Sequence, residues 1–99
     1  MAEMKTILVV DDDQHMRRFA SVALSHAGYE VVLAGNGLEG LATAIRLNPD
    51  LIVLDVMMPG EMDGLAVCHM LRNNQQMRMT PVLILSGLNQ EVDVQAGHL

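Results

Sequence analysis

Aromatic residues and cysteine are scarce in this sequence. Among its 99 residues there is no tryptophan, one phenylalanine and one tyrosine, whereas methionine occurs nine times. A folded core must therefore consist mainly of aliphatic and methionine side chains. The only cysteine, Cys68, excludes an internal disulfide and is typical of a protein from a reducing compartment.

Basic residues and long apolar stretches are also few. The chain has six lysine and arginine residues against twelve aspartate and glutamate residues, which gives a net charge of −6. This balance disfavours nucleic acid and anionic membranes as direct partners, because both would require a basic surface patch. No apolar stretch approaches the ~20 residues of a membrane span, and the N-terminus lacks the apolar region of a signal peptide. We therefore expect a cytoplasmic protein whose residues 1–99 form one domain.

Four short apolar runs are predicted to be β-strands. They cover residues 5–10, 30–34, 51–55 and 82–86. The first, third and fourth contain four consecutive apolar residues before a polar residue follows, a pattern typical of strands that are buried on both faces.

Helical patterns lie between these strands. The first predicted helix begins at Asp13 or Gln14 and ends before Gly28. Its apolar residues share one face, which we expect to be buried: Met16, Phe19, Ala20, Ala23, Leu24 and Ala27. The second helix begins with the capping pair Asn36 and Glu39. Its expected buried residues are Leu38, Leu41, Ala42 and Ile45.

A third helix is predicted to begin near Gly64, and a final short helix is expected after a cap at Asn89. The expected buried residues of the third helix are Leu65, Cys68 and Leu71, and those carried by the final helix are Val92 and Ala96. Strands and helices thus alternate with short connections. This order implies right-handed crossovers and an α/β fold, in which helices cover both faces of a parallel sheet.

Polar side chains stand at the ends of three predicted strands. Asp11 and Asp12 follow the first strand, and Asp55 ends the third. Ser86 ends the fourth. The carboxyl ends of parallel strands lie on one edge of a sheet, where α/β folds bind ligands. If the first and third strands are neighbours, with the second outside the first, a cleft opens between the acid pair and Asp55.

Three carboxylates in one cleft repel one another and raise one another's pKa. A hard divalent cation relieves this repulsion, and ligands that are all oxygen suit Mg²⁺. Beside such a cation a carboxylate can attack phosphorus and form an acyl phosphate. The hydroxyl of Ser86 would then donate a hydrogen bond to a phosphoryl oxygen. The strand ends therefore predict a magnesium-assisted phosphoacceptor site.

These motifs resemble the receiver domains of bacterial two-component response regulators. The matching stretches are residues 7–13 (ILVVDDD) with Arg17, residues 54–59 (LDVMMP) with Asp63 and Gly64, and residues 85–86 (LS). The resemblance implies a flavodoxin-like (CheY-like) doubly wound parallel sheet, in which the four strands follow the order 2-1-3-4.

The resemblance also implies a role for each site residue. Asp55 would be the phosphoacceptor, and Asp12 would bind Mg²⁺ directly while Asp11 binds it largely through water. The backbone carbonyl of Met57 would be a further magnesium ligand, and Ser86 would be the switch hydroxyl. The phosphoryl donor would be the phosphohistidine of a sensor histidine kinase or a phosphotransfer protein. Activity would be limited to self-phosphorylation and autodephosphorylation, so the chain would not be a conventional enzyme.

Two departures from the family pattern affect these expectations. Four residues, 60–63, separate Pro59 from Gly64 where receivers of this type usually have three, so we expect reshaped access to Asp55 with retained chemistry. The family continues into a fifth strand with a Lys-Pro pair and a fifth helix, and we expect this chain to be truncated before both. Its fourth strand would then be an exposed apolar edge, so we expect a homodimer through residues 82–85. The only lysine, Lys5, lies at the opposite edge of the sheet.

Three alternatives remain open at the level of sequence. Residues 35–40 fit the dinucleotide-binding pattern G-x-G-x-x-G, although these glycines also suit a turn and a helix entry. The pair Asp11 and Asp13 resembles the site of a haloacid-dehalogenase-like phosphatase, but His15 stands where that family has threonine or valine. From a different functional class, the chain could be a receiver-like interaction module that acts by protein binding or dimerisation without phosphorylation.

Overall fold

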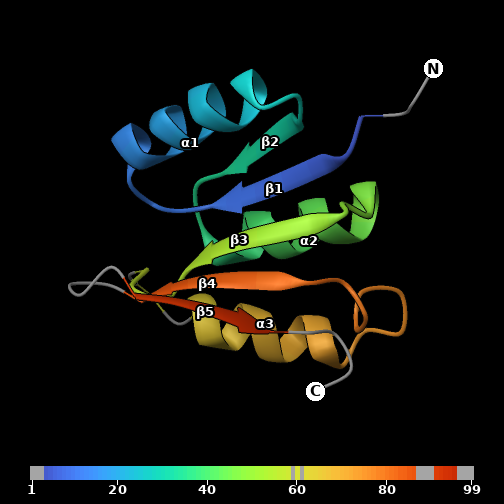
Figure 1. Ribbon diagram of the computed structural model, residues 1–99. Helices are drawn as coiled ribbons and strands as arrows, with labels where there is room; N and C mark the ends of the chain where they lie inside the picture. Colours follow the sequence, from blue (N-terminus) through green and yellow to red (C-terminus); the bar gives the residue numbers. More distant parts are fainter. Residues whose placement is uncertain (1–3, 59, 61, 87–90, 96–99) are drawn as a thin grey trace.

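A five-stranded sheet carries three helices in the computed structural model, which describes residues 4–58, 60, 62–86 and 91–95 (Figure 1). The strands are β1 (Thr6–Val10), β2 (Glu30–Ala34), β3 (Leu51–Asp55), β4 (Val82–Ser86) and β5 (Glu91–Gln95). The helices are α1 (Gln14–His26), α2 (Gly37–Leu47) and α3 (Gly64–Arg72). The sheet order is β2-β1-β3-β4-β5, with β1 to β4 parallel. The predicted order 2-1-3-4 is confirmed.

The predicted final helix is wrong, because residues 91–95 form the strand β5. This strand runs antiparallel to β4, from Ser86 opposite Glu91 to Val82 opposite Gln95. Its sequence, EVDVQ, alternates polar and apolar residues, which is the period of a strand and not of a helix. The proposed helix cap, Asn89, lies outside the described residues.

The expected open edge at β4 is therefore not observed. Its outer side is paired with β5, so the homodimer that we expected through residues 82–85 would have no free backbone edge there. In the described part of the chain, the outer position of the sheet belongs to this antiparallel strand and not to a fifth parallel strand.

The helix boundaries follow from local capping, largely as predicted. Asp13 caps α1 by accepting a hydrogen bond from the backbone N–H of His15 at 2.8 Å. Asn36 caps α2 through the N–H of Glu39, also at 2.8 Å. The side chain of Glu39 accepts a hydrogen bond from the N–H of Gly35 at 3.3 Å, one residue before the cap, so the reciprocal bond of a capping box falls one residue short of Asn36.

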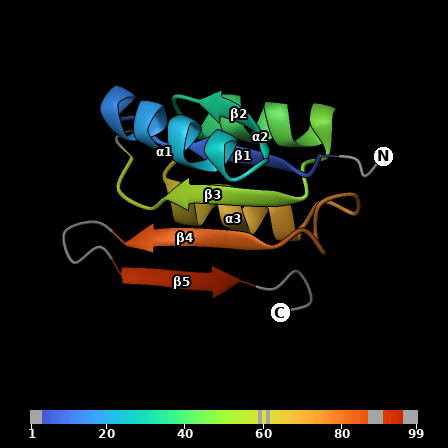
Figure 2. The same ribbon diagram turned by 45° about the horizontal axis from the view of Figure 1, so that its top comes forward.

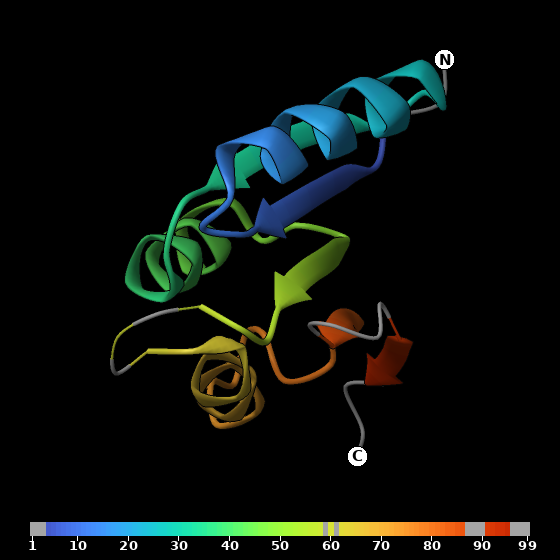
Figure 3. The same ribbon diagram turned by 90° about the vertical axis from the view of Figure 1, so that its left-hand side faces the viewer.

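The helices lie on opposite faces of the sheet, with α1 on one face and α2 and α3 on the other (Figures 2 and 3). The larger core lies under α2 and α3. Its most deeply buried side chains are Leu8, Val10, Ile52, Leu54, Val67, Leu71, Met77 and Val82. The buried residues of the α1 face are Ile7, Val9 and Val53. Among the described helices, none combines the length and apolar character that a membrane crossing would need.

The predicted buried faces of the helices are partly wrong. No residue of α1 is buried, and Phe19 is 68% exposed, although Ala20 and Leu24 do pack against the sheet. In α2, Leu41 is buried, but Leu38 and Ile45 are exposed. In α3, Cys68 and Leu71 are buried as predicted, whereas Leu65 is exposed.

Small residues explain this error in α2. A Cβ atom at Gly40 would lie 2.7 Å from a methyl carbon of Val10, so only glycine allows the helix to approach β1 this closely. The face that is buried consists of Gly37, Gly40, Leu41, Thr43 and Ala44. A search for large apolar residues at helical spacing overlooks such a face.

Candidate functional site

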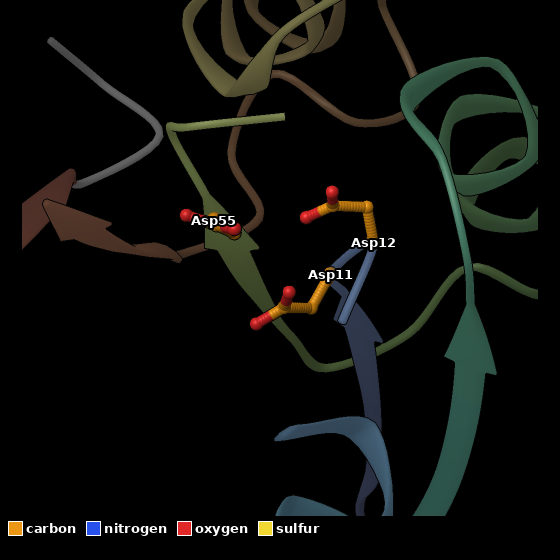
Figure 4. Close-up of side chains that lie close together, drawn as sticks. All are labelled: Asp11, Asp12 and Asp55. Atoms are coloured by element: carbon orange, nitrogen blue, oxygen red, sulfur yellow. The ribbon is translucent and has the colours of Figure 1, made fainter. Parts of the chain in front are cut away.

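Three carboxylates converge at the carboxyl edge of the sheet (Figure 4). Val10 of β1 lies opposite Leu54 of β3, so the residues that follow, Asp11 and Asp55, are brought side by side. Each of Asp11, Asp12 and Asp55 offers a carboxylate oxygen, and these oxygens lie within 4.8 Å of one another. The structure therefore brings together the three acids that the strand ends predicted would meet.

The backbone around the site fixes two of these carboxylates. The side chain of Asp11 is buried, and its Oδ1 accepts a hydrogen bond from the N–H of Asp13 at 2.9 Å. Asp55 is half-buried, and its Oδ1 accepts one from the N–H of Met57 at 3.0 Å. Asp12 is exposed. The site thus has one buried, one half-buried and one solvent-exposed carboxylate.

The electrostatics of the site favour a cation. Burial raises the pKa of Asp11 from its ordinary value of 3.8 to about 6. The hydrogen bond from Asp13 opposes this shift, while the negative charges of Asp55 and Asp12 add to it. Because the donors are all oxygen atoms and their charges repel, the residues fit a hard divalent ion such as Mg²⁺.

The acids and several apolar side chains together line an open pocket with a volume of about 790 Å³. The lining residues are Asp11, Asp12, Asp13, Met16, Phe19, Asp55, Met57 and Leu85. Met57 is 64% exposed at the pocket mouth. Asp55 lies opposite Leu85 in the sheet, so the backbone of Ser86 reaches the same edge, while its side chain lies outside the described part of the structure.

Three features of this site were not predicted. Met16 and Phe19 belong to the pocket wall and not to a buried helix face. Arg17, although noted within the motif, had no predicted role, yet its Nη1 donates a hydrogen bond to the carbonyl of Asp11 at 2.8 Å. The sequence did hold a signal for these residues. Met16, Arg17 and Phe19 follow the acidic loop within two helical turns, which places them near the end of β1.

The glycines of the G-x-G-x-x-G pattern are explained by packing. A Cβ atom at Gly37 would lie 2.3 Å from the carbonyl oxygen of Met62 and 2.8 Å from a methyl carbon of Val67. Gly40 faces Val10 in the same way. These glycines let α2 contact its neighbours closely, so their spacing needs no bound dinucleotide.

A family model described as response regulator receiver domain matches residues 7–98. The chain belongs to this family. The resemblance proposed from the motifs is thereby confirmed, and the chain is a receiver domain of two-component response regulators. The family match also displaces the phosphatase and dinucleotide-binding alternatives.

The chain is similar in sequence to known transcriptional regulators. It is 43% identical over 90 residues to the DNA-binding dual master transcriptional regulator RpaA of Synechocystis sp.. That match covers 91% of the chain and 37% of the relative, so the chain spans well under half of that protein.

Solved structures of similar fold include two instructive receivers. The chemotaxis protein CheY4 of Vibrio cholerae matches with a TM-score of 0.79 and 39% identity, over 83% of this chain and 68% of that one. The response regulator TrrA of Thermotoga maritima, solved in complex with Mg²⁺ and BeF, matches with a TM-score of 0.71 and 38% identity. This match covers 82% of the chain and 66% of TrrA. Receiver domains bind Mg²⁺ at the acidic pocket, which agrees with the donor set described above.

Proposed function

We propose that the chain accepts a phosphoryl group on Asp55 in a two-component phosphorelay. The donor is the phosphohistidine of a sensor histidine kinase or a phosphotransfer protein in the cytoplasm. The observation that carries this proposal is the convergence of Asp55 with Asp11 and Asp12 within 4.8 Å at the mouth of a pocket. A cation site and a nucleophile then occupy the same edge of the sheet.

Each residue of the site has a defined task in this proposal. Asp12, Asp55 and the backbone carbonyl of Met57 would hold Mg²⁺ directly, and Asp11 would hold it largely through water. The ion, when bound, neutralises charge on the phosphoryl oxygens and on the acids themselves. Asp11 is the buried member of the set, so its carboxylate depends most on such neutralisation.

Asp55 performs the covalent step. Its carboxylate oxygen attacks phosphorus while the bond from phosphorus to the donor imidazole nitrogen breaks, and an acyl phosphate forms. The N–H of Met57 holds Oδ1 at 3.0 Å and so fixes the orientation of the carboxylate plane. In the proposal Ser86, which follows the partner of Asp55 in β4, donates its hydroxyl to a phosphoryl oxygen.

Phosphorylation by a small donor tests this function directly. Incubation with acetyl phosphate and Mg²⁺ should add the mass of one phosphoryl group, and Asp55→Asn should abolish the adduct. Asp50→Asn is the matched control, because it is the same substitution at the opposite end of β3, where Asp50 accepts a hydrogen bond from the N–H of Thr6. Absence of an adduct on the unmodified sequence at any Mg²⁺ concentration would contradict the proposal.

A receiver-like interaction module that acts without phosphorylation is the second candidate function. The exposure of Phe19 and Met57 beside the pocket favours it, because large apolar side chains at a rim suit protein contact. This function would survive Asp55→Asn, whereas a phosphorelay would not. Binding of a partner that is unchanged by both acetyl phosphate and Asp55→Asn would support the module.

A further inference from the structure

Arg17 is bound to the backbone of the acidic loop. It lies on the first turns of α1 and is half-buried. Its side-chain Nη1 donates to the carbonyl oxygen of Asp11 at 2.8 Å, while its backbone N–H donates to the carbonyl oxygen of Asp13 at 3.0 Å. The side chain therefore folds back over the loop that connects β1 to α1.

The same guanidinium lies against the turn between β2 and α2. A Cβ atom at Gly35 would sit 3.4 Å from Nη1, which is van der Waals contact. The residue before this glycine, Ala34, accepts a hydrogen bond from the N–H of Asp11 at 3.1 Å. Asp11 is thus held at its N–H by β2 and at its carbonyl by Arg17.

The carbonyl that Arg17 contacts belongs to the peptide group between Asp11 and Asp12. Its orientation helps to set the direction in which both side chains leave the backbone. We propose that Arg17 is a positioning residue for cation binding, which holds Asp11 and Asp12 in the arrangement that a divalent ion requires. This inference rests on the proposed magnesium site.

The charge of Arg17 makes the proposal distinguishable from a simple electrostatic effect. A guanidinium near the site repels a divalent cation, so its removal should strengthen Mg²⁺ binding if charge alone matters. If Arg17 positions the ligands, its removal should weaken binding. The two accounts therefore predict changes of opposite sign.

Isothermal titration calorimetry of the whole chain with Mg²⁺, at constant ionic strength, provides the test. Arg17→Gln should weaken Mg²⁺ binding by about tenfold, the size expected when a group that orients metal ligands is lost. Arg18→Gln is the matched control. It removes the same charge from the neighbouring exposed residue and should leave the affinity unchanged or slightly higher. Arg17→Lys should give an intermediate affinity, because it keeps the charge but lacks the planar donor group.

The outcomes distinguish a failure of the positioning role from a failure of the magnesium site. If the unmodified chain binds Mg²⁺ and Arg17→Gln binds it equally well or more tightly, the positioning role is overturned while the magnesium site stands. If the unmodified chain binds no Mg²⁺, the metal-dependent function and the positioning role both fail. Thermal unfolding without metal checks that each variant is folded. Should Arg17→Gln not fold, an affinity of Arg17→Lys equal to that of the unmodified chain would overturn the proposal.

Discussion

The two faces of the sheet differ in how many side chains they bury. Under α2 and α3 one cluster buries side chains from β1, β3 and β4, whereas the α1 face buries three residues and no side chain of α1 itself. Glycines mark the closest approaches on the α2 and α3 side. Gly40 allows α2 to rest on Val10, and Gly64 brings the start of α3 against the backbone at Asp55. Helix α1 contains no glycine. The stability of the domain should therefore come mainly from one face, while the pocket opens beside the other.

The largest difference in stability between the two faces is expected from leucine substitutions in one strand, β3. Leu54 is fully buried under α2 and α3, and Leu51 is half-buried on the α1 face. Leu54→Ala should lower the free energy of unfolding by about 2–5 kcal/mol, because it leaves a cavity in a packed core. Leu51→Ala should cost about 1 kcal/mol, because its side chain already meets water. Urea denaturation measures both, and equal losses would contradict the assignment of stability to one face.

Two glycines differ in how closely the backbone around them packs. A Cβ atom at Gly64 would lie 2.3 Å from the carbonyl oxygen of Asp55 and 2.7 Å from the Cα of Val56. Gly64→Ala should therefore lower stability by about 1–3 kcal/mol, since backbone atoms must move. Gly35→Ala is the control, because its new methyl group would meet Arg17 only at an ordinary contact distance. A Gly64→Ala variant as stable as the control would show that α3 can shift without cost.

The smallest expected effect concerns the acidic edge and its dependence on pH. In the folded, metal-free chain the pKa of Asp11 is raised to about 6, above its ordinary value of 3.8. Well below pH ~4 the group is protonated in both the folded and the unfolded chain, so it carries no penalty. Between pH ~4 and about 6 the unfolded chain ionises while the folded chain keeps its proton, so the folded state is progressively destabilised, and the full penalty is present above about pH 6.

Asp11→Asn should remove this destabilisation. In the presence of a chelator the variant should melt several degrees higher than the unmodified chain at pH 7, and the difference should shrink toward pH 4. Differential scanning calorimetry across this range measures it. The other carboxylates are common to both proteins, so the difference isolates Asp11. A constant difference between pH 4 and pH 7 would contradict the burial of a charged Asp11.

The strands and the helix starts were predictable because their signals are local. Four consecutive apolar residues fit β1, β3 and β4, and the side chains of Asp13 and Asn36 cap helices wherever the following N–H groups are free. The buried helix faces were less predictable. Burial of Gly37 and Gly40 depends on what they meet, which is Met62 and Val10 from other elements.

The acid triad was predictable and its surroundings were not. Parallel strands bring their carboxyl ends to one edge whatever the side chains, so the meeting of Asp11 and Asp55 follows from topology. The bond from Arg17 to the carbonyl of Asp11 depends on one rotamer among many. The apolar contribution of Phe19 to the pocket depends on its side chain turning away from the sheet, where it stays exposed.

The contact between Gly37 and Met62 has a consequence for how this receiver can vary. After β3 the N–H of Met57 donates to Asp55, and further along the carbonyl oxygen of Met62 lies so close to Gly37 that no larger residue fits there. An extra residue in the loop between these two points costs little closure entropy. We therefore expect that the length of this loop can change by mutation while Asp55 keeps its place, which would alter the approach to the pocket without altering the chemistry at the strand end.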